Sequence, residues 1–154
     1  MRLQRAADSV RIADMASASP TGYSNKPIWA KLGLDAKRRL LVRNAPGDYA
    51  ALVGATDLAF ATPRGAFDIA HVFVKSAAAL SEELVALERR LPDHGAIWIS
   101  WPKKASRIAS DVSEDIVREI ALPLGLVDVK VCAIDAVWSG LKLVRRREAR
   151  TARS

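Results

Sequence analysis

The stretch Gly95–Lys104, GAIWISWPKK, decides the fold class. Its first seven residues, Gly95 to Trp101, carry no charge and are rich in β-branched and aromatic side chains, and Pro102 and two lysines end the run. A short apolar run between turn signals is typical of a β-strand buried on both faces. In an open α/β sheet, ligands bind outside the carboxyl ends of the strands. We therefore expect a central parallel strand here, with Lys103 and Lys104 beside a ligand site.

Alternating strand and helix patterns surround this central strand. Before it, the sequence predicts strands over 39–43, 57–60 and 67–74, and helices near 27–33, over 49–53 and over 77–91, the last with Ser76 as its N-cap. After it, a helix over 111–122 and strands over 126–134 and 141–145 are expected. Strands that alternate with helices indicate an α/β fold with a mostly parallel sheet and helices on both faces. The last two strands, joined by a short turn, would form an antiparallel hairpin at one edge.

Length and composition fit one domain of an ordinary soluble protein. The chain has 154 residues, of which 50% are hydrophobic and 27% charged. No apolar stretch approaches the roughly 18 residues of a membrane span, and no apolar signal core follows the first arginines. The single cysteine, Cys132, excludes an intrachain disulfide. These features predict a cytoplasmic protein that does not bind a membrane.

The formal net charge of +7 is concentrated at the carboxyl terminus. Residues 145–154 hold five arginines against one glutamate, a net of +4. We expect a disordered extension over 1–20, one domain over 21–145 and an arginine-rich tail over 146–154. Only this tail favours nucleic acid as a partner, and a solvated terminus is the alternative interpretation. The pattern leaves open whether Met1 or Met15 is the true start.

Long strings of this sequence resemble a bacterial family of unknown function, domain-of-unknown-function family 3052. They span about Tyr23 to Glu148 and read GYSNKPIWAKLGL, RLLVRNAPGDY, FDIAHVFVKS, GAIWISWPKKAS and VREIALPLGLVDVKVCAIDAVWSGLKLVRRRE. The order of elements is similar to the second half of the Rossmann-like methyltransferase fold. The resemblance implies a compact Rossmann-like domain with a reduced first half, and it carries over no established activity.

The first half departs from the methyltransferase pattern at its cofactor loop. Such a loop needs glycines so that the backbone can approach the ligand, but 44–49 offers Gly47 alone. No acidic residue follows Phe60 to bind ribose hydroxyls, and 61–66 is too short for a helical crossover. Either the third strand and its helices are missing, or 57–60 is not a parallel strand. We therefore predict no cofactor, with S-adenosylmethionine bound through a non-standard loop as the alternative.

Seven residues make up the predicted ligand site, because each follows a strand whose carboxyl end should lie at the same edge of the sheet. Lysines beside helix N-termini favour an anionic small molecule. The alternative is that these lysines are solvated loop charges, and that the tryptophan among them is a packing residue. The candidates are Asn44, Asp48, Lys75, Ser76, Trp101, Lys103 and Lys104.

Other reactive side chains give no catalytic or metal-binding pattern. Ser100 and Lys103 have the S-x-x-K spacing of serine acyl-enzymes, but Pro102 between them at a strand end spoils the geometry. His71 is expected to be a buried, hydrogen-bonded core histidine, and Cys132 a small core residue. Two histidines and one cysteine far apart predict no metal site.

Two function classes follow from these observations. The first is an anion-binding or interaction module that keeps the sheet and has lost the cofactor loop. The second is a divergent methyltransferase that uses S-adenosylmethionine. Catalytic residues and the oligomeric state are left open by the sequence.

Overall fold

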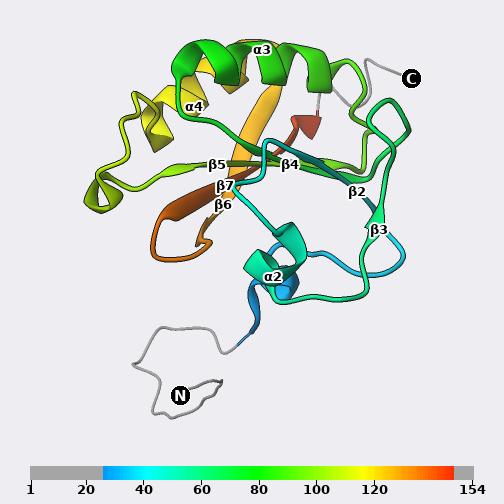
Figure 1. Ribbon diagram of the computed structural model, residues 1–154. Coiled ribbons are helices and arrows are strands. Elements are labelled where there is room, and N and C mark those ends of the chain that lie inside the picture. The colour runs from blue at the N-terminus through cyan, green and yellow to red at the C-terminus, as the bar shows by residue number, and fades with distance from the viewer. Residues whose placement is uncertain (1–25, 148–154) are drawn as a thin grey trace, which may run out of the picture.

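The computed structural model describes residues 26–147, which form one six-stranded sheet with the order β3-β2-β4-β5-β7-β6 (Figure 1). The strands are β2 (Arg39–Arg43), β3 (Ala59–Phe60), β4 (Ile69–Phe73), β5 (Ala96–Pro102), β6 (Leu126–Ala133) and β7 (Trp138–Arg145). Strands β3, β2, β4 and β5 run parallel, whereas β7 lies antiparallel between β5 and β6. The predicted α/β fold with an antiparallel C-terminal hairpin is confirmed.

Helices cover both faces of the sheet, as predicted. Figure 1 shows α3 (Ala77–Glu88) and α4 (Glu114–Ala121) above it, and α2 (Tyr49–Val53) below it, beside α1 (Ile28–Lys31). Each face has its own apolar core. The α3 and α4 side includes Leu80, Leu84, Leu87, Ile97, Ile99 and Val117, and the α1 and α2 side includes Leu32, Tyr49, Val53, Phe73 and Trp98.

The first half of the fold is reduced because β3 is only two residues long. It pairs with the start of β2, Arg39 with Ala59 and Leu40 with Phe60. Leu40 also pairs with Ile69 on the other side of β2, so the chain leaves β3 and enters β4 at the same level of the sheet. Residues 61–68 therefore only have to cross β2 sideways, and no helix is needed. The short strand is parallel, and among residues 26–147 the third strand with its helices is missing.

The starts of two predicted elements each differ from the structure by three residues. Helix α4 begins at Glu114 rather than Asp111, because the hydroxyl of Ser113 accepts the backbone N–H of Ile116 and caps it. Strand β7 begins at Trp138, since Asp135 makes the turn by accepting the N–H groups of Val137 and Trp138. The connection between β6 and β7 is therefore 134–137, shorter than the 135–140 left between the two predicted strands.

Arg145 corrects the reading of the carboxyl-terminal charge. The sequence placed its charge with the arginine run, but its side chain is only 1% exposed. The guanidinium binds Glu88 Oε2 at 2.8 Å and the carbonyls of Glu88 and Leu91 at 2.9 and 2.6 Å. Arg145 thus belongs to the core and satisfies backbone carbonyls at the end of α3.

The predicted extension over 1–20 and most of the predicted tail lie outside the described residues. A chain shortened to Thr21–Arg146 should melt within about 4 °C of the full chain, because neither end carries core periodicity. Differential scanning calorimetry of both chains measures this. Loss of a cooperative transition in the short chain would show that one of the ends is part of the folded unit.

Candidate functional site

The seven predicted site residues lie at or after the carboxyl ends of β2, β4 and β5. Asn44 and Asp48 come after β2, Lys75 and Ser76 after β4, and Trp101 to Lys104 close β5. The parallel registers of β2, β4 and β5 bring these ends to one edge of the sheet, which we call the carboxyl edge. At this edge, however, the seven residues do not form one site: they make different local contacts and line different hollows.

The topological switch point lies between β2 and β4. The chain goes from β2 to β3 on one side of β2, and then returns to β4 on the other side of β2. On the α3 side of this point, the residues at the end of β2 contact a carboxylate of α3. Arg43 pairs with Glu83 of α3 at 2.6 Å, and the Asn44 side-chain amide donates to the same carboxylate at 3.2 Å. Asn44 adopts φ 63°, in the left-handed region. The side chain of Asn44 is therefore hydrogen-bonded to Glu83 in this structure.

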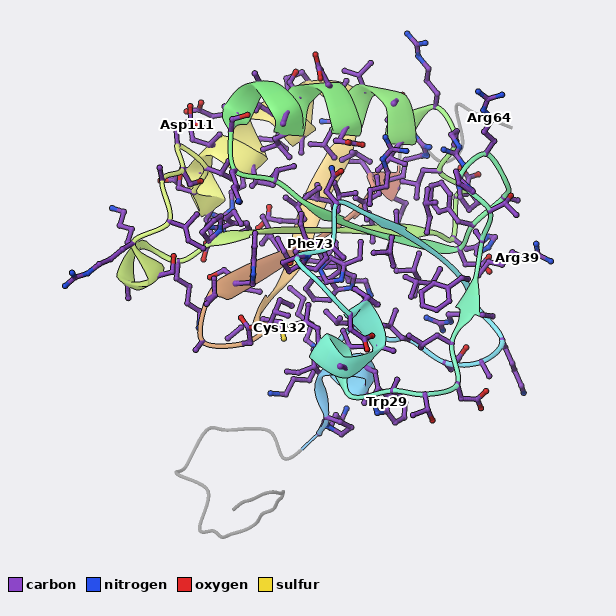
Figure 2. The ribbon with its side chains drawn as sticks, in the orientation of Figure 1. Trp29, Arg39, Arg64, Phe73, Asp111 and Cys132 are labelled. Atoms are coloured by element: carbon purple, nitrogen blue, oxygen red, sulfur yellow. The ribbon has the colours of Figure 1, made fainter. Side chains whose placement is uncertain are left out.

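The N-terminus of α3 also has partners within the protein. The Ser76 hydroxyl accepts the backbone N–H of Ala79 at 3.1 Å, so Ser76 is the N-cap, as predicted. The Asp111 carboxylate accepts the N–H of Ala77 at 2.7 Å, and Figure 2 shows Asp111 beside this end of α3. Asp111 thus holds the place that an anion would take at this terminus. The sequence assigned Asp111 to the start of α4 instead.

A hollow of about 420 Å³ lies at the end of β5, and we call it the β5 hollow. Trp101, Lys103 and Lys104 line one side of it, and Trp101 is buried. Its other lining residues include Ser113, Glu114, Asp115 and Ser139, none of which the sequence indicated as site residues. The run Ser113-Glu114-Asp115 has the pattern of a helix start and could have been found, whereas Ser139 carries no sequence signal.

The charges in the β5 hollow are unevenly paired. Glu114 and Asp115 each pair with Arg118, at 2.7 and 3.3 Å. Lys103 donates to the neutral carbonyl of Asp135 at 2.7 Å, and no carboxylate of residues 26–147 pairs with either Lys103 or Lys104. Arg118 also pairs with Asp128 at 3.0 Å, so its one charge is shared among three carboxylates. The formal charges of the two lysines and the two acids that line the hollow balance, but among the described residues the two lysines have no ion-pair partner of their own.

A second hollow of about 470 Å³, the β2-loop hollow, lies beside the loop after β2. Pro46, Gly47, Asp48, Asp135 and Trp138 are among its lining residues. Asp48 is the N-cap of α2 and accepts the N–H of Ala51 at 3.2 Å. A Cβ on Gly47 would meet nothing within 4 Å, so no close backbone approach requires the glycine there. The charged groups lining this hollow, Asp48 and Asp135, are acidic.

A buried polar network lies behind the carboxyl edge, in the core between the sheet and α2. Tyr49 Oη and His71 Nδ1 are 2.7 Å apart, and His71 Nε2 and Ser100 Oγ are also 2.7 Å apart. Burial lowers the pKa of His71 to about 3 and raises that of Tyr49. Neutral His71 thus donates from one nitrogen and accepts at the other. The prediction of a buried, hydrogen-bonded histidine is confirmed, and buried Ser100 lies in this network.

Metal and membrane features are lacking in the part of the chain that the structure describes. Over residues 26–147, no three His, Cys, Asp or Glu side chains gather as a metal site would require. None of the helices there combines the length and apolar character needed to span a bilayer. Cys132 is a free, buried thiol in the core on the α2 side.

Comparisons with known proteins identify the fold and no family. No family model and no curated protein matches the chain, so the resemblance to family 3052 stays a prediction. Among solved structures, a protein of the NADB-Rossmann superfamily from Streptococcus agalactiae is similar with a TM-score of 0.50 and 8% identity, over 82% of this chain and 71% of that one. Human N-acetylserotonin methyltransferase, in complex with SAM, gives a TM-score of 0.50 and 9% identity over 72% of this chain.

The chain spans about half of that human enzyme, 48% of its length. A ribosomal protein L11 methylase from Lactobacillus delbrueckii is also similar, with a TM-score of 0.46 and 14% identity over 71% of each chain. At these identities the likeness concerns the fold alone. The fold is Rossmann-like and is shared with SAM-dependent methyltransferases.

Proposed function

We propose that this chain is a small-ligand-binding module whose ligand is an anionic molecule held in the β5 hollow. One observation carries the proposal: Lys103 and Lys104 line this hollow without a carboxylate partner among residues 26–147, while Glu114 and Asp115 of the same hollow pair with Arg118. The hydroxyls of Ser113 and Ser139 border the same space. Ammonium groups and hydroxyls form strong hydrogen bonds with phosphate or carboxylate oxygens.

The same edge argues against a cofactor bound in the ordinary Rossmann manner. Gly47 is the one glycine of the loop after β2, and Asn44 is bound to Glu83. Strand β3 ends level with Leu40, three residues short of the end of β2. A residue that follows β3 is therefore not positioned at the carboxyl edge to bind a ribose, as that manner of binding needs.

A second candidate function is a divergent SAM-dependent methyltransferase. The fold supports it, since one neighbour with this fold was solved with SAM. The β2-loop hollow supports it as well, because Asp48 and Asp135 would attract the sulfonium and amino groups of this cofactor. The two candidates thus place their ligands in different hollows, and a single titration separates them.

Adenosine monophosphate and S-adenosylmethionine should be titrated separately into the labelled protein at constant ionic strength, with backbone amides followed by NMR. We expect the nucleotide to shift the amides of Lys104, Ser113 and Ser139. Replacing Lys103 and Lys104 by Ala should weaken its binding there by tenfold or more, because two charge-assisted contacts are lost.

A variant with Lys31→Ala and Lys37→Ala is the matched control, since it removes the same charge from lysines that precede β2 in the chain. It should bind like the natural protein. The single change Lys104→Ala checks that the effect does not come from the lost contact of Lys103 with the Asp135 carbonyl. Tight binding of S-adenosylmethionine with shifts at Gly47 and Asp135, unaffected by the double change, would replace the first candidate by the second.

A further inference from the structure

A hollow of about 300 Å³ lies at the opposite, amino edge of the sheet, and we call it the amino-edge hollow. Ile69 of β4, Ala96 of β5 and Val144 of β7 give it apolar surface from three adjacent strands. The charged groups that line it are Arg38, just before β2, and Lys142 on β7, with Asp68 and the His94 imidazole from neighbouring loops. An apolar surface with a few convergent polar groups is the usual form of a small-molecule site.

Lys142 carries an uncompensated charge in this hollow. It is half-buried, and within residues 26–147 its side-chain ammonium makes no hydrogen bond or ion pair. Its partner on β6 is Lys130, directly opposite in the register. Like charges that face one another across a strand pair destabilise a sheet. Burial, together with the charges of Arg38 and Lys130, lowers the pKa of Lys142.

The nearby carboxylates make no ion pair with Lys142 within residues 26–147. Asp68 Oδ2 accepts the backbone N–H of Arg39 at 2.8 Å, and Asp68 Oδ1 lies 3.1 Å from His94 Nε2. Asp35 accepts the N–H groups of Lys37 and Arg38, and it lies 4.0 Å from the Arg38 guanidinium. Both carboxylates keep their negative charge and interact with Arg38. The positive charge without an ion-pair partner among the described residues of this hollow is therefore that of Lys142, which lines it together with Arg38.

We propose that the amino-edge hollow is a second binding site, for the phosphate or carboxylate group of a small molecule. The guanidinium of Arg38 matches such an oxyanion with two parallel N–H donors, and Lys142 adds a point charge. The apolar surface of Ile69, Ala96 and Val144 would receive an apolar part of the ligand. This site is independent of the β5 hollow, which lies at the other end of β5.

The test uses the full chain and two probes of one charge class, inorganic phosphate and benzoate, at constant ionic strength. Both should shift the backbone amides of Gly95, Ala96 and Lys142 in NMR spectra. A stronger response to benzoate would indicate a carboxylate with an apolar body, and a stronger response to phosphate would indicate a phosphoryl group. Lys142→Met and Arg38→Gln should each weaken binding of the preferred probe by about tenfold.

Arg39→Gln is the matched control for Arg38→Gln, because Arg39 is the next residue, is exposed and points away from the body of the molecule (Figure 2). Lys104→Met is the control for Lys142→Met, at the other edge. Both controls should leave the amide shifts of Gly95 and Ala96 unchanged, and so should the Lys103→Ala, Lys104→Ala variant, which separates this site from the proposed function.

Three results would overturn the site. The first is the absence of shifts at Gly95, Ala96 and Lys142 with both probes. The second is an equal response to sodium chloride at the same ionic strength, which would be general screening. The third is equal affinity of the Lys142→Met, Arg38→Gln and natural chains. If one of these variants does not fold, the other variant and the amide shifts of the natural chain still test the site.

Discussion

Replacing Arg145 by Met should lower the free energy of unfolding by about 3 to 5 kcal/mol, because a buried ion pair loses one partner. The guanidinium binds the Glu88 carboxylate and donates to the carbonyls of Glu88 and Leu91, and its Nε lies 3.7 Å from Asp93. Methionine fills a similar volume but donates no hydrogen bond. The change would leave two carbonyls at the end of α3 without this donor.

Urea unfolding followed by circular dichroism measures the effect, with the slope of the transition as a check on two-state behaviour. Arg146→Ala is the matched control, because Arg146 is exposed and should change the free energy by less than about 0.5 kcal/mol. Glu88→Gln keeps the size of the side chain and its hydrogen-bonding carbonyl oxygen, and it should cost less than the loss of Arg145. A cost below about 1 kcal/mol for Arg145→Met would mean that this contact does not hold α3 to β7.

The contrast between Arg145 and Arg146 shows what the sequence could and could not predict. Runs of uncharged residues identified β5 and β4 to within a few residues, since these strands are buried on both faces. Helical spacing of leucines identified α3. An arginine at the start of an arginine run carries no such signal. Its burial depends on Glu88 and Leu91, which are more than fifty residues away in the chain.

The sequence indicated where the candidate site lies, but not which charged side chains pair with one another around it. The rule for carboxyl strand ends placed Trp101, Lys103 and Lys104 correctly beside a hollow. It did not reveal that Asp111 accepts a backbone N–H at the start of α3, or that Arg118 pairs with the acids of α4. Nor did it indicate that Glu114 and Asp115 line the same hollow as the lysines. Such contacts depend on loop conformations that no local pattern encodes.

Between pH 6.5 and about 4.5 the protein should lose stability at about 1.4 kcal/mol per pH unit because of His71 alone. The imidazole is fully buried between Tyr49 and Ser100 and stacks on Phe73, with ring centroids 4.4 Å apart. Burial lowers the pKa of His71 from 6.5 to about 3 in the folded protein. The unfolded chain therefore binds a proton in this range and the folded chain does not, so stability is full above pH 6.5 and falls as the pH decreases toward 3.

Urea unfolding at half-unit pH steps measures this slope, and the window above pH 4.5 keeps it apart from Asp35 and Asp68, whose lowered pKa values act below 3.8. His71→Gln should flatten the slope, whatever its stability at pH 7, because the amide still hydrogen-bonds but does not titrate. His94→Gln is the control for the other histidine: its side chain is 73% exposed, and its removal should leave the slope in place. If His71→Gln retains the full slope, the proton is taken up elsewhere, and the buried network does not set the acid sensitivity of this fold.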